Sequence, residues 1–557
     1  MNRLESSEVR TGSAGRLGVG LIMLALTVGV SACGGSGNAA SSTKATPATL
    51  TITTPPAAGD IDKVNWALPK GEPSTLDPVK TGDYSPNTVV LNMCEPLMAL
   101  QPDFSVKPGL AENVTQPDSK TMVFTIRRGV TFWDGTPLTA ADVAFSLQRN
   151  LDPRNTPVGG ALFRSVAAIK ATGPLQVTVT FVRHDAQFLN TMASVSSAIS
   201  EKAFVERAGK NYGSPRAGVM CTGPFKFGKW AAGDRIVLAR NDQYWSTKAK
   251  AKEFDFVFFT DDSTLTSALL AGQIDGTYEA PLGSIDTLRK ASGGKLYYGP
   301  STQSLSIGPV SATGPAADPR VRRALDLAID KPSLIKNVLH GAGSPLRTFT
   351  PQLTWAGDPA KAVYDQGYQG LPDNAAANLA QAKSLIAQAA PATKNLTMVI
   401  PSGDQLSLQT ATIVQADAHQ IGLTISIKQM QPTSFSELFY DPTKRAGIDL
   451  IVASGYIEVP GAYYYAPGFV LKDGPFNWTG WSDPQVSKLM TDGQQATDPQ
   501  VAAKDFVAAQ AIFGPADLQI SLASLNELLY LNNKITGAPA SFAYISSAWA
   551  ASVGKSQ

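Results

Sequence analysis

Hydrophobic and polar residues alternate over residues 124–126 and again over 130–132, which is the period of a half-buried β-strand. Asp134-Gly135 follows, a pair that favours a tight turn because glycine tolerates a positive φ at little steric cost. Thr139-Ala-Ala-Asp142 has the form of a capping box with Asp in the place of the usual Glu or Gln. The pattern therefore predicts two short strands, a turn, and a helix that runs past Leu147.

Strand-like and helix-like patterns alternate over most of the chain. Residues 175–181 and 424–428 have the pattern of strands, and residues 378–386 have that of an amphipathic helix. This alternation favours α/β domains. The 557 residues exceed the roughly 250–300 at which a single core stops growing, so two or more domains are expected. No internal repeat is visible.

The first 32 residues have the pattern of an export signal. Arg10 and Arg16 precede a run of apolar residues, 17–30, which is too short to span a bilayer comfortably. The run ends in Val30-Ser31-Ala32-Cys33, which resembles a lipobox and implies that Cys33 becomes a lipidated N-terminus. Cleavage near Ala32 by an ordinary signal peptidase and an uncleaved anchor are the alternatives. Residues 33–60 are rich in Gly, Ala, Ser, Thr and Pro and are predicted to be a flexible tether.

Charge and histidine content exclude several classes of function. The net charge is only +2 and there is no long basic run, which argues against nucleic acid as a partner. The three histidines, His184, His340 and His419, are far apart in sequence, so we expect neither a metal site nor a bound cofactor. The motifs G-x-S-x-G, H-E-x-x-H and C-x-x-C and the P-loop are all absent, and we expect no catalytic residues.

The segment 124–147 resembles the signature of extracytoplasmic solute-binding proteins of family 5, the dipeptide, oligopeptide and nickel receptors of ABC importers. Further segments resemble the family in the same order: Trp66-Ala-Leu-Pro, Ser74-Thr-Leu-Asp-Pro78, Cys94-Glu-Pro-Leu97, Cys221-Thr-Gly-Pro-Phe, Arg240-Asn-Asp-Gln-Tyr-Trp245, Gly272-Gln-Ile-Asp275, Asp318-Pro-Arg-Val-Arg-Arg-Ala-Leu325 and Ala328-Ile-Asp-Lys331. Together they cover some 480 residues, nearly the whole chain after the signal.

The resemblance implies an α/β, two-lobed fold like that of periplasmic binding proteins, type II, with an accessory subdomain in lobe I. The chain is expected to cross between the lobes near residues 298–309 and 520–525. The expected division is signal peptide 1–32, tether 33–60, lobe I 61–97, accessory subdomain 98–205, lobe I 206–305, lobe II 306–520 and lobe I 521–557.

Cys94 and Cys221 are the two cysteines that remain after Cys33. An even pair in an oxidising compartment favours a disulfide, and two separate buried thiols are the alternative. The implied fold favours the disulfide, because it places both segments where the chain leaves and re-enters one lobe.

Peptide-binding members of the family anchor the ligand's α-amine on a carboxylate that follows a strand and a Gly-Trp pair. In this chain Gly455 and Tyr456 stand in the place of that pair, and Glu458 is the nearest carboxylate, with a structural carboxylate as the alternative. Tyr84 is a further candidate for the cleft. Tyr278 matches a position at which members of the family have ligand-contacting tyrosines, with an aromatic residue on the lobe surface as the alternative. On the second lobe, Tyr463, Tyr464 and Tyr465 are candidates for the cleft wall, with core packing as their alternative. Trp478 and Trp481 belong to the same aromatic region.

The resemblance implies a non-enzymatic, monomeric receptor that is lipid-anchored to the outer face of the cytoplasmic membrane. It would capture peptides or a similar small solute by hinge closure and deliver them to an ABC permease and ATPase complex. A sensor or envelope accessory protein without a role in import is the alternative reading. An exported hydrolase is a remote one, because a Ser-His-Asp triad is recognised by geometry and not by sequence order.

Overall fold

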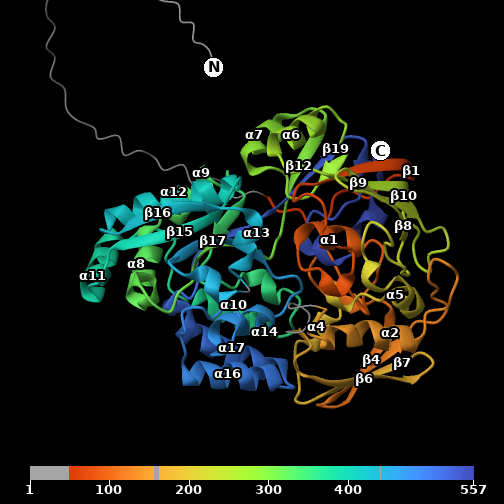
Figure 1. Ribbon diagram of the computed structural model, residues 1–557, viewed down its shortest axis with the longest axis horizontal. Helices are drawn as coiled ribbons and strands as arrows, with labels where there is room; N and C mark the ends of the chain where they lie inside the picture. Colours follow the sequence, from red (N-terminus) through yellow and green to blue (C-terminus); the bar gives the residue numbers. More distant parts are fainter. Residues whose placement is uncertain (1–48, 156–161, 440) are drawn as a thin grey trace, which may run out of the picture. The chain divides into compact units, whose positions relative to one another are not determined.

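A computed structural model describes residues 49–155, 162–439 and 441–557 (Figure 1). The signal peptide, Cys33 and most of the predicted tether lie outside the described residues. Within the described part of the chain, no helix is both long and apolar enough to cross a membrane.

The segment 121–148 folds largely as its pattern predicts. β5 covers Thr121–Ile126, and helix α2 covers Ala140–Gln148. Both halves of the capping box are formed, since the Thr139 hydroxyl accepts from the Asp142 N–H and the Asp142 carboxylate accepts from the Thr139 N–H. Residues 130–132, predicted as a strand, form only one isolated bridge, Thr131 to Pro137, because the turn at Gly135 folds the chain back at once.

The described residues form five sheets, of which two have only two strands, β2-β3 and β20-β21. The sheet of lobe I has the order β12-β19-β11-β1-β10-β9-β8, and that of lobe II has the order β14-β18-β13-β17-β15-β16. The accessory subdomain has a four-stranded antiparallel sheet, β4-β5-β7-β6, with α2 packed on it. Figure 1 shows the accessory sheet beside lobe I and the lobe II sheet apart from both.

The strands have the following bounds. In lobe I they are β1 Ile61–Leu68, β8 Phe225–Ala231, β9 Arg235–Arg240, β10 Ala251–Phe258, β11 Gly276–Thr277, β12 Gly294–Gly299 and β19 Glu527–Asn532. In lobe II they are β13 Gln303–Pro309, β14 Gly343–Pro345, β15 Asn395–Pro401, β16 Thr424–Met430, β17 Leu450–Tyr456 and β18 Ile520–Leu525. The others are β2 Met98–Leu100, β3 Val106–Pro108, β4 Ala111–Asp118, β6 Val166–Gly173, β7 Gln176–Phe181, β20 Ile535–Thr536 and β21 Gly554–Lys555.

The helices before the first crossover are α1 Tyr84–Val90, α4 Phe188–Thr191, α5 Lys202–Ala208, α6 Asp262–Leu270 and α7 Ile285–Lys290, besides α2. Those of lobe II are α8 Pro319–Ala328, α9 Lys331–Asn337, α10 Lys361–Gln369, α11 Leu379–Ala389, α12 Gln405–Gln420, α13 Pro432–Glu437, α14 Ala462–Tyr465, α15 Pro467–Val470, α16 Pro484–Gln495 and α17 Pro499–Phe513. Lobe II has two main cores, one between its sheet and helices α8, α11 and α12, and one among α10, α16 and α17.

The chain passes between the two sheets twice. It leaves β12 at Gly299 and enters β13 at Gln303, and it leaves β18 at Leu525 and enters β19 at Glu527. The first crossover lies within the predicted range. The second lies just beyond it, because β18 pairs with β13, so residues 521–525 belong to the sheet of lobe II and not to lobe I as predicted.

Cys94 and Cys221 are joined by a disulfide. Beside it, the Glu95 carboxylate accepts hydrogen bonds from the Thr222 hydroxyl, the Tyr244 hydroxyl and the Trp245 indole, at 2.7, 2.6 and 3.0 Å. Motifs separated by some 150 residues thus meet at one buried carboxylate. Burial raises the pKa of Glu95, and these three donors oppose the rise.

The described end of the predicted tether is bound to lobe I. The Thr51 N–H donates to Tyr298 O, the Thr54 N–H donates to Ala538 O, and the Ala58 N–H donates to Lys555 O. The predicted tether, 33–60, therefore extends too far, because residues 51–58 are hydrogen-bonded to lobe I.

Candidate functional site

The parallel strands of lobe I end along one edge of their sheet. β1, β10 and β11 run parallel, and β19 runs against them, so its first residue lies at the edge where the others end. Ligands of open α/β sheets bind outside the carboxyl ends of the strands. The polar residues that the topology brings to this edge are Lys70, Asp262, Glu279 and Glu527.

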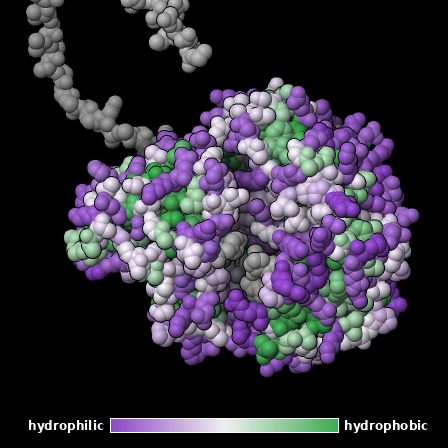
Figure 2. All heavy atoms as spheres, in the orientation of Figure 1, coloured by the Kyte–Doolittle hydropathy of each residue, from purple (hydrophilic) through white to green (hydrophobic). Residues whose placement is uncertain are grey.

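Lobe II has a matching edge. β15 and β17 run parallel and end at Pro401 and Tyr456, while β13 runs against β17 and begins at Gln303. Asp404 and Glu458 follow the two parallel strands. Because the crossovers join this edge to the edge of lobe I, the two sets of strand ends face each other, and Figure 2 shows a furrow between the lobes on the face that it displays.

Tyr84 and Tyr456 meet across the two lobes. Their rings are in edge-to-face contact with centroids 4.7 Å apart. The Tyr456 hydroxyl donates to Gly82 O and accepts from Asn87 Nδ2, each at 3.3 Å. Both rings are partly exposed, and Gly455 is partly exposed on the same strand. The predicted residues Tyr84, Gly455 and Tyr456 therefore stay candidates for the cleft wall.

Glu458 lies in the contact between the lobes. It is 7% exposed, and its Oε1 accepts from the Val195 N–H at 2.6 Å and from the Ser546 hydroxyl at 2.9 Å, both in lobe I. Burial raises the pKa of Glu458 despite these donors. The carboxylate predicted to anchor an amine is thus occupied by the protein's own donors, which a ligand would have to displace.

Two of the predicted aromatic residues are core residues. The Tyr278 side chain is 2% exposed, stacks on Tyr544 with centroids 3.5 Å apart, and donates its hydroxyl to Pro539 O at 2.8 Å. Tyr463 is 3% exposed and donates to Ala502 O within the helical core of lobe II. The prediction that these two rings contact the ligand is wrong for a physical reason, since neither has surface to offer. Tyr464 is partly exposed and packs on the core of lobe I.

The edge of lobe I carries a group of charged side chains that act on one another and that sequence reasoning missed. Burial raises the pKa of Glu279 to about 7, with Lys70 opposing the rise and Asp83 adding to it. Burial and the charge of Glu279 also raise the pKa of Glu527 well above its usual range. Glu279, followed by Asp404, raises the pKa of Lys70. Carboxyl groups thus outnumber ammonium groups here, and a ligand with positive charge would favour the ionised forms that burial now disfavours.

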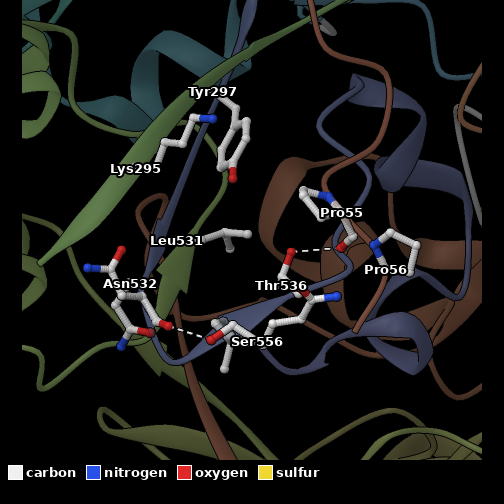
Figure 3. A pocket seen from close by; sticks show the side chains of 11 residues that line it. Pro55, Pro56, Lys295, Tyr297, Leu531, Asn532, Thr536 and Ser556 are labelled. Carbon is white, nitrogen blue, oxygen red and sulfur yellow. Dashed lines mark hydrogen bonds between the residues drawn. The ribbon is translucent and has the colours of Figure 1, made fainter. Parts of the chain in front are cut away.

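A small pocket lies at the opposite edge of the lobe I sheet, where β19 ends and β12 begins (Figure 3). Its walls include Pro55, Pro56, Tyr297 and Leu531, and Lys295 lies 4.7 Å from the centroid of the Tyr297 ring. It is remote from the strand ends that face lobe II, and it contains no carboxylate side chain. Among the residues that the structure describes, no three His, Cys, Asp or Glu side chains are grouped as metal ligands would be.

Comparison with known proteins gives a family. Residues 105–477 match the model of bacterial extracellular solute-binding proteins, family 5. Protein XP55 of Streptomyces lividans is 27% identical over 444 residues, 78% of each chain. The glutathione-binding protein GsiB of Escherichia coli K12 is 25% identical over 448 residues, 79% of this chain and 84% of that protein.

Solved structures of the same fold agree. The oligopeptide-binding protein AppA of Bacillus subtilis, in complex with a nonapeptide, has a TM-score of 0.76 at 19% identity and covers 90% of this chain and 100% of its own. The murein tripeptide binding protein MppA of Escherichia coli has a TM-score of 0.77 at 21% identity, over 90% and 99%. Both are two-lobed, which confirms the predicted fold. The chain therefore belongs to the bacterial extracellular solute-binding proteins of family 5, which are binding proteins and not enzymes.

Proposed function

We propose that this protein is the lipid-anchored receptor of an ABC importer, which captures peptides or a similar small solute between its lobes and delivers them to a membrane permease and its ATPase. The observation that carries the proposal is the pair of facing strand-end edges, which two crossovers join within the described residues and which Tyr84 and Tyr456 line. Such an arrangement suits hinge closure around a ligand. Family membership removes the hydrolase alternative.

A peptide-like ligand is supported by two observations. A relative that is 25% identical over 79% of this chain is named for binding glutathione, a tripeptide. Two structural neighbours were solved in complex with peptides. The surplus of carboxylates around Lys70 also suits a solute that carries a protonated amine. A nickel chelate is the second candidate, because NikA of Staphylococcus aureus in complex with Ni(L-His)2 has the same fold, with a TM-score of 0.72.

The ligand class is tested by thermal unfolding of the purified protein, with mass spectrometry of any solute that co-purifies with it. A ligand that binds only the folded state raises the melting temperature. At a concentration of a hundred times its Kd, it adds about 2.7 kcal/mol to the free energy of unfolding. A tripeptide pool is expected to raise it. A response to Ni(L-His)2 alone would replace the peptide by the chelate and leave the receptor role intact.

Lipid anchoring is tested by cell fractionation. The wild type is expected in the membrane fraction and Cys33→Ser in the soluble fraction, with Ser36→Ala as the control that behaves like the wild type. Recovery of Cys33→Ser in the membrane would contradict the anchor. Deletion of neighbouring permease genes distinguishes an import receptor from a sensor. Import of the identified ligand should stop if the protein is an import receptor, and it should continue if the protein is a sensor.

A further inference from the structure

Glu527 is a buried carboxylate at the second crossover between the lobes. It is the first residue of β19, and its side chain is 1% exposed. Oε1 accepts from the Glu279 N–H at 2.8 Å, but Oε2 has no hydrogen-bond partner among the described residues. Buried carboxylate oxygens are normally paired, because an unpaired one loses its hydration without compensation. The unpaired Glu527 Oε2 is therefore available to accept a hydrogen bond from a donor outside the lobe.

Glu279 is held beside it in an uncommon backbone conformation. Its φ of 51° lies in the left-handed region, which residues other than glycine, asparagine and aspartate seldom adopt. The hydrogen bond from its N–H to Glu527 keeps it there. Glu279 is partly exposed, whereas Glu527 is buried. The strained residue thus contacts the Glu527 carboxylate through its backbone N–H, and the charge of its own carboxylate acts on Glu527.

We propose that Glu279 and Glu527 form a subsite for a protonated primary amine of the solute, at the crossover end of the cleft. The inference rests on the proposed receptor function and narrows its ligand class. An ammonium has three N–H donors and no acceptor, which matches one orphaned oxygen and a neighbouring carboxylate, and such hydrogen bonds are stronger than neutral ones. A metal ion is the poorer match, since two carboxylates offer too few ligands and no third candidate ligand joins them among the described residues.

The subsite explains how the amine is recognised although Glu458 is engaged elsewhere. Glu458 already accepts from Val195 and Ser546, so its role is to join the lobes. Glu527 has an open acceptor, and Lys70 at the mouth of the same edge can meet an anionic group of the same solute. A zwitterionic solute thus satisfies both signs of charge at the lobe I edge.

The geometry also makes binding dependent on pH. In the empty site, burial and mutual repulsion favour a proton on the pair, and an arriving ammonium must replace that proton. Affinity is therefore expected to rise as the pH rises through about 7, the pKa of Glu279, and to fall again above about 8, where the α-amine of the solute loses its own proton. Lys70 and Asp83 act electrostatically on Glu279, and Asp262 and Asp404 act on Lys70. The charges of the pair in turn act on three tyrosines, Tyr84, Tyr278 and Tyr544.

The test uses the mature protein and two tripeptide pools. One pool has free N-termini, and the other is N-acetylated and lacks Lys, Arg and His, so that it carries no positive charge. The free-amine pool is expected to raise the melting temperature at about pH 7, where most peptide N-termini are still protonated, and less at pH 6, and the acetylated pool is expected to have little effect. Equal shifts with both pools would refute the amine subsite and leave the peptide receptor standing, whereas no shift with either would refute the receptor and the subsite with it.

Three variants locate the effect. Glu279→Gln and Glu527→Gln keep an oxygen acceptor and remove the negative charge, and each is expected to weaken binding of the free-amine pool at least tenfold. Glu279→Gln is also expected to remove the rise in affinity near pH 7. Glu253→Gln is the matched control, because its carboxylate is 44% exposed in a surface ion pair with Lys63. If Glu527→Gln fails to fold, Glu279→Gln decides by itself. Wild-type affinity in the folded Gln variants would overturn the proposal.

Discussion

Glu279 makes a prediction about stability that needs no ligand. Its pKa is about 7 in the folded protein, against an ordinary value of 4.5, because burial penalises the charged form more than Lys70 favours it. For a carboxyl group with a raised pKa, the folded state binds the proton more tightly than the unfolded state. The contribution is therefore fully present below pH 4.5 and is lost as the pH rises through 7.

The size of the effect follows from the shift. A difference of 2.5 pKa units corresponds to about 3 kcal/mol, and the partial exposure of Glu279 makes this an upper figure. The folded body has about 500 residues, and an unfolding entropy of about 2.1 cal/mol/K per residue converts this free energy into about 3 °C of melting temperature. Glu279→Gln cannot titrate, so its melting temperature should gain up to about 3 °C relative to the wild type between pH 4.5 and pH 8.

The assay is a thermal unfolding series on ligand-free wild type and Glu279→Gln at constant ionic strength. Other buried acids also titrate, and the difference between the two proteins removes their contribution. Lys70→Met supplies a second arm, because the loss of this cation should raise the pKa of Glu279 further and move the change to higher pH. A difference between wild type and Glu279→Gln that stays constant within 1 °C over the whole range would refute the reasoning.

The remaining predictions concern the disulfide, the contact between the lobes and the aromatic residues. Cys94→Ser combined with Cys221→Ser should lose about 5 kcal/mol of unfolding free energy in urea, the chain-entropy value for a loop of 127 residues, and a reductant should affect the wild type alone. Glu458→Ala should lower the free energy of unfolding by about 3 kcal/mol, because two donors in lobe I lose their acceptor. It should also enlarge the radius of gyration in small-angle scattering, and an unchanged radius would show that this contact does not hold the lobes together. Tyr84→Ala should weaken ligand binding in titration calorimetry with little effect on stability. Tyr278→Ala should cost about 3–5 kcal/mol in denaturation as a core truncation, and a smaller loss would contradict its assignment to the core.

Local signals predicted the elements well where each signal acts within a few residues. The capping box at Thr139 and Asp142 forms as expected, because a cap depends on hydrogen bonds between residues three apart. The first crossover and the role of Tyr278 were instead inferred from the resemblance to the family, which located the crossover and misplaced Tyr278. Local pattern offered no check on Tyr278, because a two-residue strand such as β11 has no period from which the buried face can be inferred.

The acidic pair could not be found from local sequence, because it is a product of topology. Glu279 and Glu527 are 248 residues apart, and they meet only because β19 returns from lobe II and pairs antiparallel with β11. A strand-end carboxylate such as Glu458 is visible in a sequence, but whether it is free depends on what the other lobe brings to it. In a two-lobed receptor the elements are specified locally, whereas the recognition of the ligand depends on which strand-end groups the contact between the lobes leaves unpaired. By that criterion the crossover at Glu527, and not the strand end at Glu458, is where ligand selectivity should be altered first.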